Sequence, residues 1–474
     1  MVVIISSNVL FSESSGYLEA EEGTVTSHIT QKDIKDAVDI TSAAKTFDLN
    51  LRHFGPYKMQ FTKNGRHLVL GGRKGHLAAM DWITKKLLCE INVMESIHDV
   101  CWLHTEQMMV AAQKKWVYIY DNNGIELHCI KKLNRVLKLE FLPYHFLLCA
   151  GDDTGFLSWL DVTLGKEVIQ IFTHKGRLEI MCQNPYNAVL CCGHPNGTVT
   201  MWTPNSQEPV ASVFCHHRPI RAVEFDPSGR YMATSGDRRV KIWDARNLGQ
   251  HLQCYSTRSV VSHLSFSQRR LLAMSMDNVV EVYQNVTTGG ASEAYMRHNS
   301  GSTITDMQFC PYEDILGIST YHGYSSLIIP GAGEPNFDAL EANPYESVSG
   351  RREAEVKSLL SKVPADLITL DPLSIGQVDL PRLQEKLDAK NALLYVRKPK
   401  IDFTPRYRMK GKSNSAQKFK RKQKMKESQQ RDYLKAAVLQ RENFGIGKTK
   451  KIKKIVSESA EILDRFKPKE KMLH

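Results

Sequence analysis

The sequence predicts an all-β fold, a seven-bladed β-propeller followed by an extended, partly helical and basic C-terminal arm. The first observation is a repeat of about 40 residues, because six β-rich runs end on an aromatic residue, Met or Leu followed by Asp or a polar substitute. The six pairs are Met80-Asp81, Tyr120-Asp121, Leu160-Asp161, Trp202-Thr203, Trp243-Asp244 and Tyr283-Gln284. They are spaced 40, 40, 42, 41 and 40 residues apart, and a weaker seventh run ends at Ile329-Pro330. This period with a Trp-Asp-like ending is the signature of WD40 blades.

The second observation is the order of apolar and turn residues within each repeat. Every repeat reads strand, turn, strand, Gly or Asp turn, strand, which is typical of one blade. The clearest repeat has the turn Asp226-Pro227-Ser228-Gly229 between its first two strands. We expect the blades at residues 55–93, 94–133, 134–173, 174–215, 216–256, 257–298 and 299–345.

A short segment before the first repeat predicts how the ring closes. Phe47-Asp48-Leu49-Asn50-Leu51 alternates apolar and polar residues, as a half-buried strand does. Propellers usually complete their last blade with an N-terminal strand, which protects the exposed sheet edges. We therefore expect Phe47 to Leu51 to complete blade seven.

Blade five carries the polar residues that pin a WD40 blade internally. A His, a Ser or Thr, an Asp and a Trp at such positions form a chain of hydrogen bonds. The four residues of this expected structural tetrad are His217, Thr234, Asp237 and Trp243. Only blade five has the full set, so we expect the other blades to depend more on apolar packing.

The chain divides into four expected segments. Residues 1–45 form an N-terminal extension with one possible helix over 29–45, and residues 46–345 form the propeller. Residues 346–396 form a C-terminal module that packs on or near the propeller, with a helix over 351–363. Residues 397–474 form a basic tail, helical over 417–442 and otherwise helical or disordered.

Charge is distributed unevenly along these segments. The chain has 474 residues and a formal net charge of +12. Residues 397–474 contain 25 Lys and Arg against 8 Asp and Glu, so the tail carries +17 and the remainder −5. A basic tail on a mildly acidic body predicts a polyanionic partner, reached through the tail.

Several other classes of protein are disfavoured by the sequence. The ten cysteines include no CxxC pair, so we expect neither zinc nor any other metal, and we interpret them as reduced thiols of a cytosolic or nuclear protein. The start of the chain is a poor signal peptide, and no apolar stretch is long enough to span a membrane. Gly445-Ile446-Gly447-Lys448-Thr449 resembles the end of a P-loop, but Glu442 stands where the first Gly belongs. No Ser/His/Asp set has a believable spacing, so we expect no cofactor and no enzymatic activity.

The tail contains the candidates for RNA or partner binding. A helix with Lys and Arg on all sides repels itself and needs an anion, which phosphates supply with counterion release. An import signal or a plain solvated tail are the alternatives. The candidates are Arg406, Tyr407, Arg408, Lys410, Lys412, Lys418, Lys420, Arg421, Lys422, Lys424 and Lys426. Further candidates on the propeller surface are Arg73, Lys74, Lys114 and Lys115.

Particular stretches of the blades and of the segment after them resemble one family. These stretches are Phe54-Gly55-Pro56-Tyr57, Asn64-Gly65-Arg66-His67-Leu68, Gly71-Gly72-Arg73-Lys74-Gly75-His76, the run from Gln113 to Asp121, the run from Leu139 to Leu148, Arg351 to Val356, and Ile368 to Pro372. They resemble the WD-repeat subunit of the U3 small nucleolar ribonucleoprotein, or small-subunit processome, called BING-four in animals. The resemblance covers roughly residues 30–440.

The resemblance implies a non-catalytic scaffold in the nucleus and nucleolus that supports assembly and processing of small-subunit (18S) pre-ribosomal RNA. Its implied partners are pre-ribosomal RNA or the U3 snoRNA particle and other processome proteins, without a membrane and without homo-oligomerisation. The alternative is a WD40 adaptor or substrate receptor of a ubiquitin ligase or another nuclear complex. That alternative predicts that the basic tail is dispensable.

Overall fold

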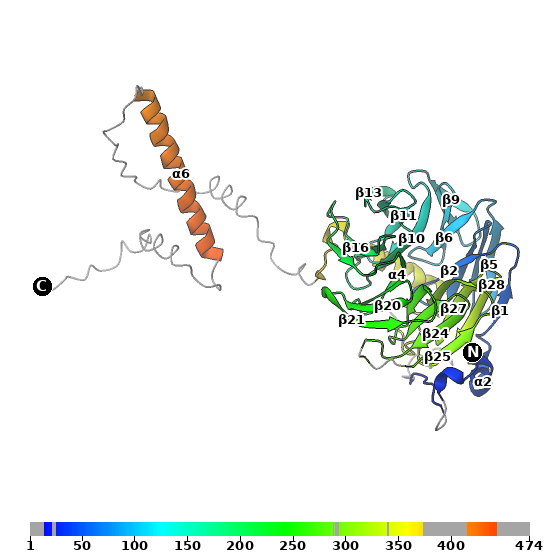
Figure 1. Cartoon of the computed structure of the whole chain (residues 1–474). Helices are drawn as coiled ribbons and strands as arrows, with labels where there is room; N and C mark the ends of the chain where they lie inside the picture. The colour runs from blue at the N-terminus through cyan, green and yellow to red at the C-terminus, as the bar shows by residue number, and fades with distance from the viewer. Residues whose placement is uncertain are drawn as a thin grey trace, which may run out of the picture. The chain divides into compact units, whose positions relative to one another are not determined.

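A computed structural model describes residues 14–20, 25–287, 289, 293–338, 341–372 and 415–442 of the chain. The chain separates into two compact units, Met1–Ser374 and Ile375–His474 (Figure 1). The first unit contains the propeller, and the second contains one described helix.

The first unit confirms the expected seven-bladed propeller, because its described strands form seven antiparallel sheets of four strands. Blade one contains β2 (Tyr57–Phe61), β3 (His67–Gly72), β4 (His76–Asp81) and β5 (Lys86–Asn92). Blade two contains β6 (Ile97–Trp102), β7 (Met108–Gln113), β8 (Val117–Asp121) and β9 (Glu126–Ile130). Blade three contains β10 (Val136–Leu142), β11 (Leu147–Asp152), β12 (Phe156–Asp161) and β13 (Lys166–Phe172). Blades four and five contain β14 (Ile180–Gln183), β15 (Leu190–Gly193), β16 (Thr198–Trp202) and β17 (Ala211–Phe214); and β18 (Ile220–Phe225), β19 (Tyr231–Gly236), β20 (Arg239–Asp244) and β21 (Asn247–Ser256). Blades six and seven contain β22 (Val261–Phe266), β23 (Leu272–Met276), β24 (Val279–Tyr283) and β25 (Met296–Asn299); and β26 (Ile304–Phe309), β27 (Ile315–Thr320), β28 (Gly323–Ile328) and β1 (Asp48–Asn50).

The blades close into a ring around their first strands. The strands β2, β6, β10, β14, β18, β22 and β26 each contact the next in this order, and β26 contacts β2. Blade seven is completed by β1, which pairs antiparallel with β28, Leu49 lying opposite Tyr324. This pairing confirms the closing strand expected at Phe47 to Leu51, and it joins distant parts of the chain within one sheet.

Small residues at the ends of second strands allow adjacent blades to approach closely. At Gly71, at the end of β3, an added Cβ would lie 2.5 Å from a methyl carbon of Val100 in blade two. Every residue of β3 and β4 is buried, whereas the outermost strand β5 exposes most of its residues. Apolar packing between inner strands therefore holds the ring together, and each outer strand faces solvent with much of its length.

Short helices precede the propeller where we expected one helix over 29–45. The structure has the 3-10 helix η1 (Thr26–His28) followed by α2 (Gln31–Ala37) and α3 (Ile40–Ala43). The single-helix prediction is wrong because Val38 is extended, with a ψ of 160°. The side chain of Val38 packs from this extended backbone against the core of the first unit.

Among the residues that the structure describes, three further helices follow the last blade. They are α4 (Val348–Leu360), η2 (Ala365–Leu367) and, in the second unit, α6 (Ser415–Glu442). Helix α4 begins three residues before the expected 351 and ends at Leu360 rather than 363. The Ser347 side chain caps its first turn by accepting from the Gly350 amide.

The hydrogen-bonded set in blade five uses His216 instead of the expected His217. His216 Nε2 lies 3.0 Å from Thr234 Oγ1, which also accepts from Trp243 Nε1 at 3.0 Å. The backbone explains the correction, because the amides of Cys215 and His216 both bond to the Gly197 carbonyl and turn His216 inward. The ring of His217 instead lies against Phe214. Burial lowers the pKa of His216 to about 4, so this imidazole is neutral at physiological pH.

Asp237 does not join this set among the described contacts. It is exposed in the turn after β19, with a φ of 57°. Asp237 is therefore a turn residue, and the hydrogen-bonded set consists of His216, Thr234 and Trp243.

Blade four contains a second bonded set that the sequence did not reveal. Thr200 Oγ1 lies 2.5 Å from His194 Nε2 and accepts from Trp202 Nε1 at 2.8 Å. The His comes from the turn before the third strand rather than from the start of the blade, which hid the pattern. Burial also lowers the pKa of His194 to about 4.

Candidate functional site

The two ends of the ring form two faces with different charge. We define the strap face as the loops that join first to second and third to fourth strands, and the open face as the loops that join second to third strands and one blade to the next. The open-face loops contain thirteen Lys and Arg against five Asp and Glu, a formal charge of +8. The strap-face loops contain seven against six, a charge of +1.

The strap face carries the segment that follows blade seven. We call residues 341–372 the strap. In chain order, its described contacts reach loops of blades one, two, three and four. These contacts are Lys63 with Glu341, His104 with Glu355, Glu106 with Arg351, Tyr144 and His145 with Val363, Asp161 and Thr163 with Lys362, Asn205 with Asp366 and Ile368, and Asn187 with Leu370. The strap therefore lies across four consecutive blades.

Charged contacts fix the middle of the strap. Lys362 Nζ lies 2.5 Å from Asp161 Oδ2 and 2.7 Å from Thr163 Oγ1. Burial alone would raise the pKa of Asp161, but hydrogen bonds from Lys362 and Thr163 outweigh it and hold the pKa below its ordinary value. The pKa of Glu106 is lowered in the same way, burial being outweighed by the Arg351 guanidinium. Both carboxylates are thus stabilised in their charged form by the strap.

An apolar residue near its end anchors the strap in the propeller core. Ile368 is 2% exposed and packs in the same buried cluster as Trp159 and Trp202. Its backbone carbonyl accepts from Asn205 Nδ2 at 3.0 Å. The strap is thus integrated into the propeller fold through blades three and four.

Helix α4 is held by its polar side chains. Its apolar side chains are exposed to solvent, with Val356 56% and Leu360 83% exposed. The contacts to blade two come instead from Arg351 and Glu355. The exposed apolar residues of α4 are therefore available on the outer side of the strap.

The N-terminal extension also contacts the strap face, at blades six and seven. Lys45 Nζ lies 2.5 Å from Glu313 Oε2 in the first loop of blade seven. The Leu18 amide donates to Tyr295 Oη at 2.8 Å. Segments from both ends of the propeller sequence thus converge on this face.

The surface candidates Arg73, Lys74, Lys114 and Lys115 all lie on the open face. They occupy the turns between second and third strands of blades one and two, and all four are exposed. Gly75, with a φ of 102°, makes the first of these turns possible.

Ionisable side chains line the central channel, a feature that the sequence did not reveal. Lys138 Nζ lies 3.1 Å from Asp99 Oδ2, and these residues stand on the first strands of blades three and two. Burial raises the pKa of Glu140 to about 7, and burial together with the Glu140 charge raises that of Glu224 to about 8. These positions alternate with core residues along their strands, so in the sequence they look like the solvent-facing positions of any half-buried strand.

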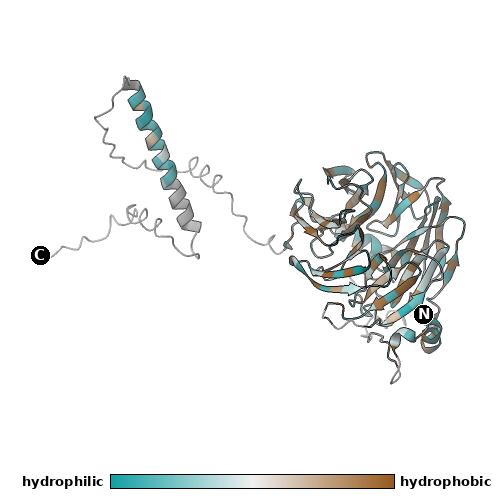
Figure 2. Ribbon diagram, in the orientation of Figure 1, coloured by the Kyte–Doolittle hydropathy of each residue, from teal (hydrophilic) through white to brown (hydrophobic). Residues whose placement is uncertain are grey.

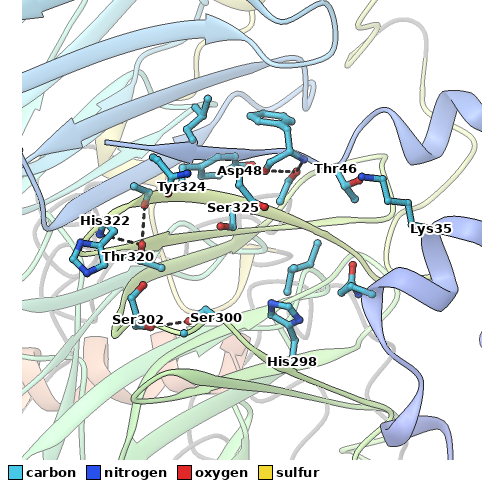
Figure 3. Close-up of a pocket in the computed structure, with 18 of the residues that line it drawn as sticks. Lys35, Thr46, Asp48, His298, Ser300, Ser302, Thr320, His322, Tyr324 and Ser325 are labelled. Carbon is cyan, nitrogen blue, oxygen red and sulfur yellow. Dashed lines mark hydrogen bonds between the residues drawn. The ribbon is translucent and has the colours of Figure 1, made fainter. Parts of the chain in front are cut away.

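A polar cleft of about 600 Å³ lies beside the closing strand β1. Figure 3 shows Lys35 of α2, Asp48 of β1 and His298 of β25 around it. Several of its hydroxyl groups bond within the chain, as Ser300 Oγ does to the Ser302 carbonyl at 2.7 Å. The cleft lies at the junction of blades six and seven.

The tail candidates on α6 are exposed lysines and an arginine of the second unit. The described side chains from 417 to 433 are almost all exposed, including Phe419 at 69%. In Figure 2 the coloured part of α6 is predominantly hydrophilic. The candidates on this helix are Lys418, Lys420, Arg421, Lys422, Lys424 and Lys426. Arg406, Tyr407, Arg408, Lys410 and Lys412 lie outside the described residues.

Two family models match the first unit of the chain. The WD domain, G-beta repeat model matches residues 207–244, and the BING4CT (NUC141) domain model matches residues 294–371. The second match begins just before β25 and continues through blade seven and the strap. The last blade and the strap are thus covered by a single family model, and the protein is a WD-repeat propeller with a BING4CT domain.

Full-length comparison gives a narrower assignment. The chain is 48% identical to WD repeat-containing protein 46 of Homo sapiens over 439 residues, 92% of this chain and 72% of that protein. It is 44% identical to the Caenorhabditis elegans protein of the same name, over 85% of this chain and 70% of that protein. It is 42% identical to U3 small nucleolar RNA-associated protein 7 of Saccharomyces cerevisiae, over 81% of this chain and 73% of that protein. The chain belongs to this family of WD-repeat proteins.

Proposed function

We infer that this protein acts in the small-subunit processome, where it supports processing of 18S ribosomal RNA as a scaffold. The observation that carries this function is the similarity over most of the chain to a protein named for its association with U3 small nucleolar RNA. The resemblance noted in the blade and strap sequences points to the same particle. Its place of action is then the nucleolus.

The arrangement of the first unit supports a scaffold without catalysis. A ring fixed by inter-blade packing and by its own strap presents rigid surfaces, which suits simultaneous binding of several proteins. Propellers serve many functions, so the family relationship, rather than the fold, selects this one.

We further propose that α6 and the basic residues around it contact RNA in that particle. A helix with exposed lysines along its described length gains stability when phosphates neutralise it. The exposed apolar residues of α4 are a surface for proteins of the particle.

Depletion and rescue in cells test this function. Loss of the protein should lower 18S ribosomal RNA and accumulate its precursors, and the tagged full chain should restore both and co-purify U3 RNA. A chain in which Lys418, Lys420, Lys422, Lys424 and Lys426 are replaced by Gln should recover less precursor RNA after crosslinking. Normal 18S levels in depleted cells would refute the function, whereas full recovery by the Gln chain would refute only the role of the tail.

A further inference from the structure

Blades two and three bring five cations and one indole together on the open face. The turn before β8 contributes two lysines, and the loop after β9 contributes two lysines and an arginine. Val117 pairs with Ile130, so the residues just outside this pair lie side by side. The Arg135 amide donates to the Lys115 carbonyl at 2.9 Å, which ties the two loops together. We name this group the Trp116 cluster, consisting of Lys114, Lys115, Trp116, Lys131, Lys132 and Arg135.

The indole ring organises the positive charges around it. The Nζ atoms of Lys115 and Lys131 lie 4.6 and 5.4 Å from the centroid of the Trp116 ring. Cation–π attraction holds each ammonium group near the ring. The lysines themselves remain exposed, and the ring is partly exposed. Two flexible side chains are therefore held together at the surface before any ligand arrives.

Carboxylates do not neutralise the positive charges of the Trp116 cluster. Among the ion pairs of the described residues, none includes a cation of the Trp116 cluster. Arg177 of blade four, by contrast, is 2.7 Å from both Asp153 and Glu179. Uncompensated like charges raise the energy of the free protein, and an anionic ligand removes that cost.

The chemistry of the cluster favours a nucleic acid strand over an acidic peptide. Phosphates along one strand present regularly spaced charges that release counterions on binding. Bases between them can stack on a partly exposed aromatic ring, an interaction that carboxylate side chains do not offer. Arg73 and Lys74 extend the positive surface into the neighbouring blade one. We propose that the Trp116 cluster is a binding site for single-stranded RNA on the propeller itself, separate from the basic tail.

The choice of RNA rests on the proposed function, whereas the site rests on the contacts above. Binding of an oligouridine of about 20 nucleotides to the purified full chain, measured by fluorescence anisotropy at several salt concentrations, tests the site directly. The chain should carry Gln at Lys418, Lys420, Lys422, Lys424 and Lys426, so that tail binding does not mask the propeller. Exchanging Lys114, Lys115, Lys131 and Lys132 for Gln should weaken binding more than about tenfold and lower the log–log salt slope by about 3, at about 0.7 per lost phosphate contact.

A matched control removes the same charge from the strap-face side. Exchanging Lys86, Lys166, Arg230 and Arg269 for Gln should change affinity less than about threefold, because these residues lie at the other end of the blades. Trp116→Leu should weaken RNA binding about fivefold or more with little change in salt slope, since it removes stacking rather than phosphate contacts. Thermal melting of each variant verifies that it is folded.

Two results would overturn the proposal. One is an equal loss of RNA affinity in the cluster variant and the control variant, which would mean that binding depends only on net charge. The other is competition by polyglutamate as strong as that by oligouridine together with no effect of Trp116→Leu, which would identify an acidic protein segment as the ligand. Neither result would alter recovery of 18S RNA in the rescue experiment, so the proposed function is tested independently.

Discussion

The strap face and the open face are built from the same seven blades but are used in opposite ways. The strap face is nearly neutral, with a formal loop charge of +1, and the chain's own strap lies across it. The open face has a loop charge of +8 and keeps most of its cations in solvent. The chain therefore covers one end of the ring with its own segments, and the RNA site that we propose lies at the other end.

We expect the largest effect from a substitution that weakens the apolar anchor of the strap on its face of the propeller. Ile368→Ala should lower the free energy of unfolding by about 2–4 kcal/mol, because it leaves a cavity in the buried cluster that contains Trp159 and Trp202. Urea denaturation measures the loss. Leu370→Ala, two residues further along and 47% exposed, should cost less than about 0.5 kcal/mol. Equal losses for both variants would show that the strap is not anchored at Ile368.

The bonded set of blade five connects His216, in an open-face loop, to Thr234 on β19 inside the blade. Thr234→Val should destabilise by about 2–3 kcal/mol, because His216 and the Trp243 N–H lose their buried partner. Thr105→Val is the matched control, since the Thr105 hydroxyl is buried without a partner among the described atoms. In denaturation experiments, the free energy of unfolding of the Thr105→Val variant should equal or exceed that of the wild type. A neutral Thr234→Val would contradict the assignment of the set.

The channel that joins the two faces should make stability depend on pH. The pKa of Glu224 is raised to about 8 in the folded protein, so its folded form stays protonated while the unfolded form ionises at an ordinary pKa near 4. Stability contributed by this group is complete below that ordinary pKa and is lost as pH rises towards 8. Glu224→Gln should therefore stabilise the protein by about 1–3 kcal/mol above pH 8 and have little effect near pH 4.

Melting curves of the Glu224→Gln variant across pH measure this effect. The exposed Glu126→Gln provides the control and should shift stability by less than about 0.5 kcal/mol at every pH. A uniform destabilisation by Glu224→Gln would mean that the folded protein uses the charged carboxylate.

The smallest expected effect comes from the ion pair of the strap. Lys362→Met should cost about 1 kcal/mol at neutral pH, whereas Lys357→Met, exposed on α4, should cost almost nothing. The Asp161 pKa is lowered in the fold, so this contribution is present above the ordinary carboxyl pKa of about 4 and is lost as pH falls through the lowered value. A difference between wild type and Lys362→Met that persists at pH 2 would contradict this electrostatic origin.

The sequence predicted the ring more fully than its faces. Period and alternation were sufficient for the blades and for β1, because both are local patterns. The choice between His216 and His217 depended on backbone bonds to Gly197, which no local pattern encodes. The path of the strap was equally hidden, since Lys362 and Asp161 lie 201 positions apart.

The Trp116 cluster was predicted in part. Lys114 and Lys115 stand out beside a Trp in the sequence, but the lysines at 131 and 132 join them only through the pairing of β8 with β9. The difference between the faces also required the strands, because the loops of each face alternate along the chain. The tail candidates, in contrast, were visible from composition alone.

Crosslinking of RNA to the protein within purified particles tests the difference between the faces most directly. Mass spectrometry of the crosslinked peptides reports which loops contact RNA. We expect adducts in the loops around Trp116 and Lys131 on the open face, and none in the strap-face loops around Tyr144 and Asn205. Adducts concentrated on those strap-face loops, with none near Trp116, would contradict the division of the propeller into a covered face and an RNA-binding face.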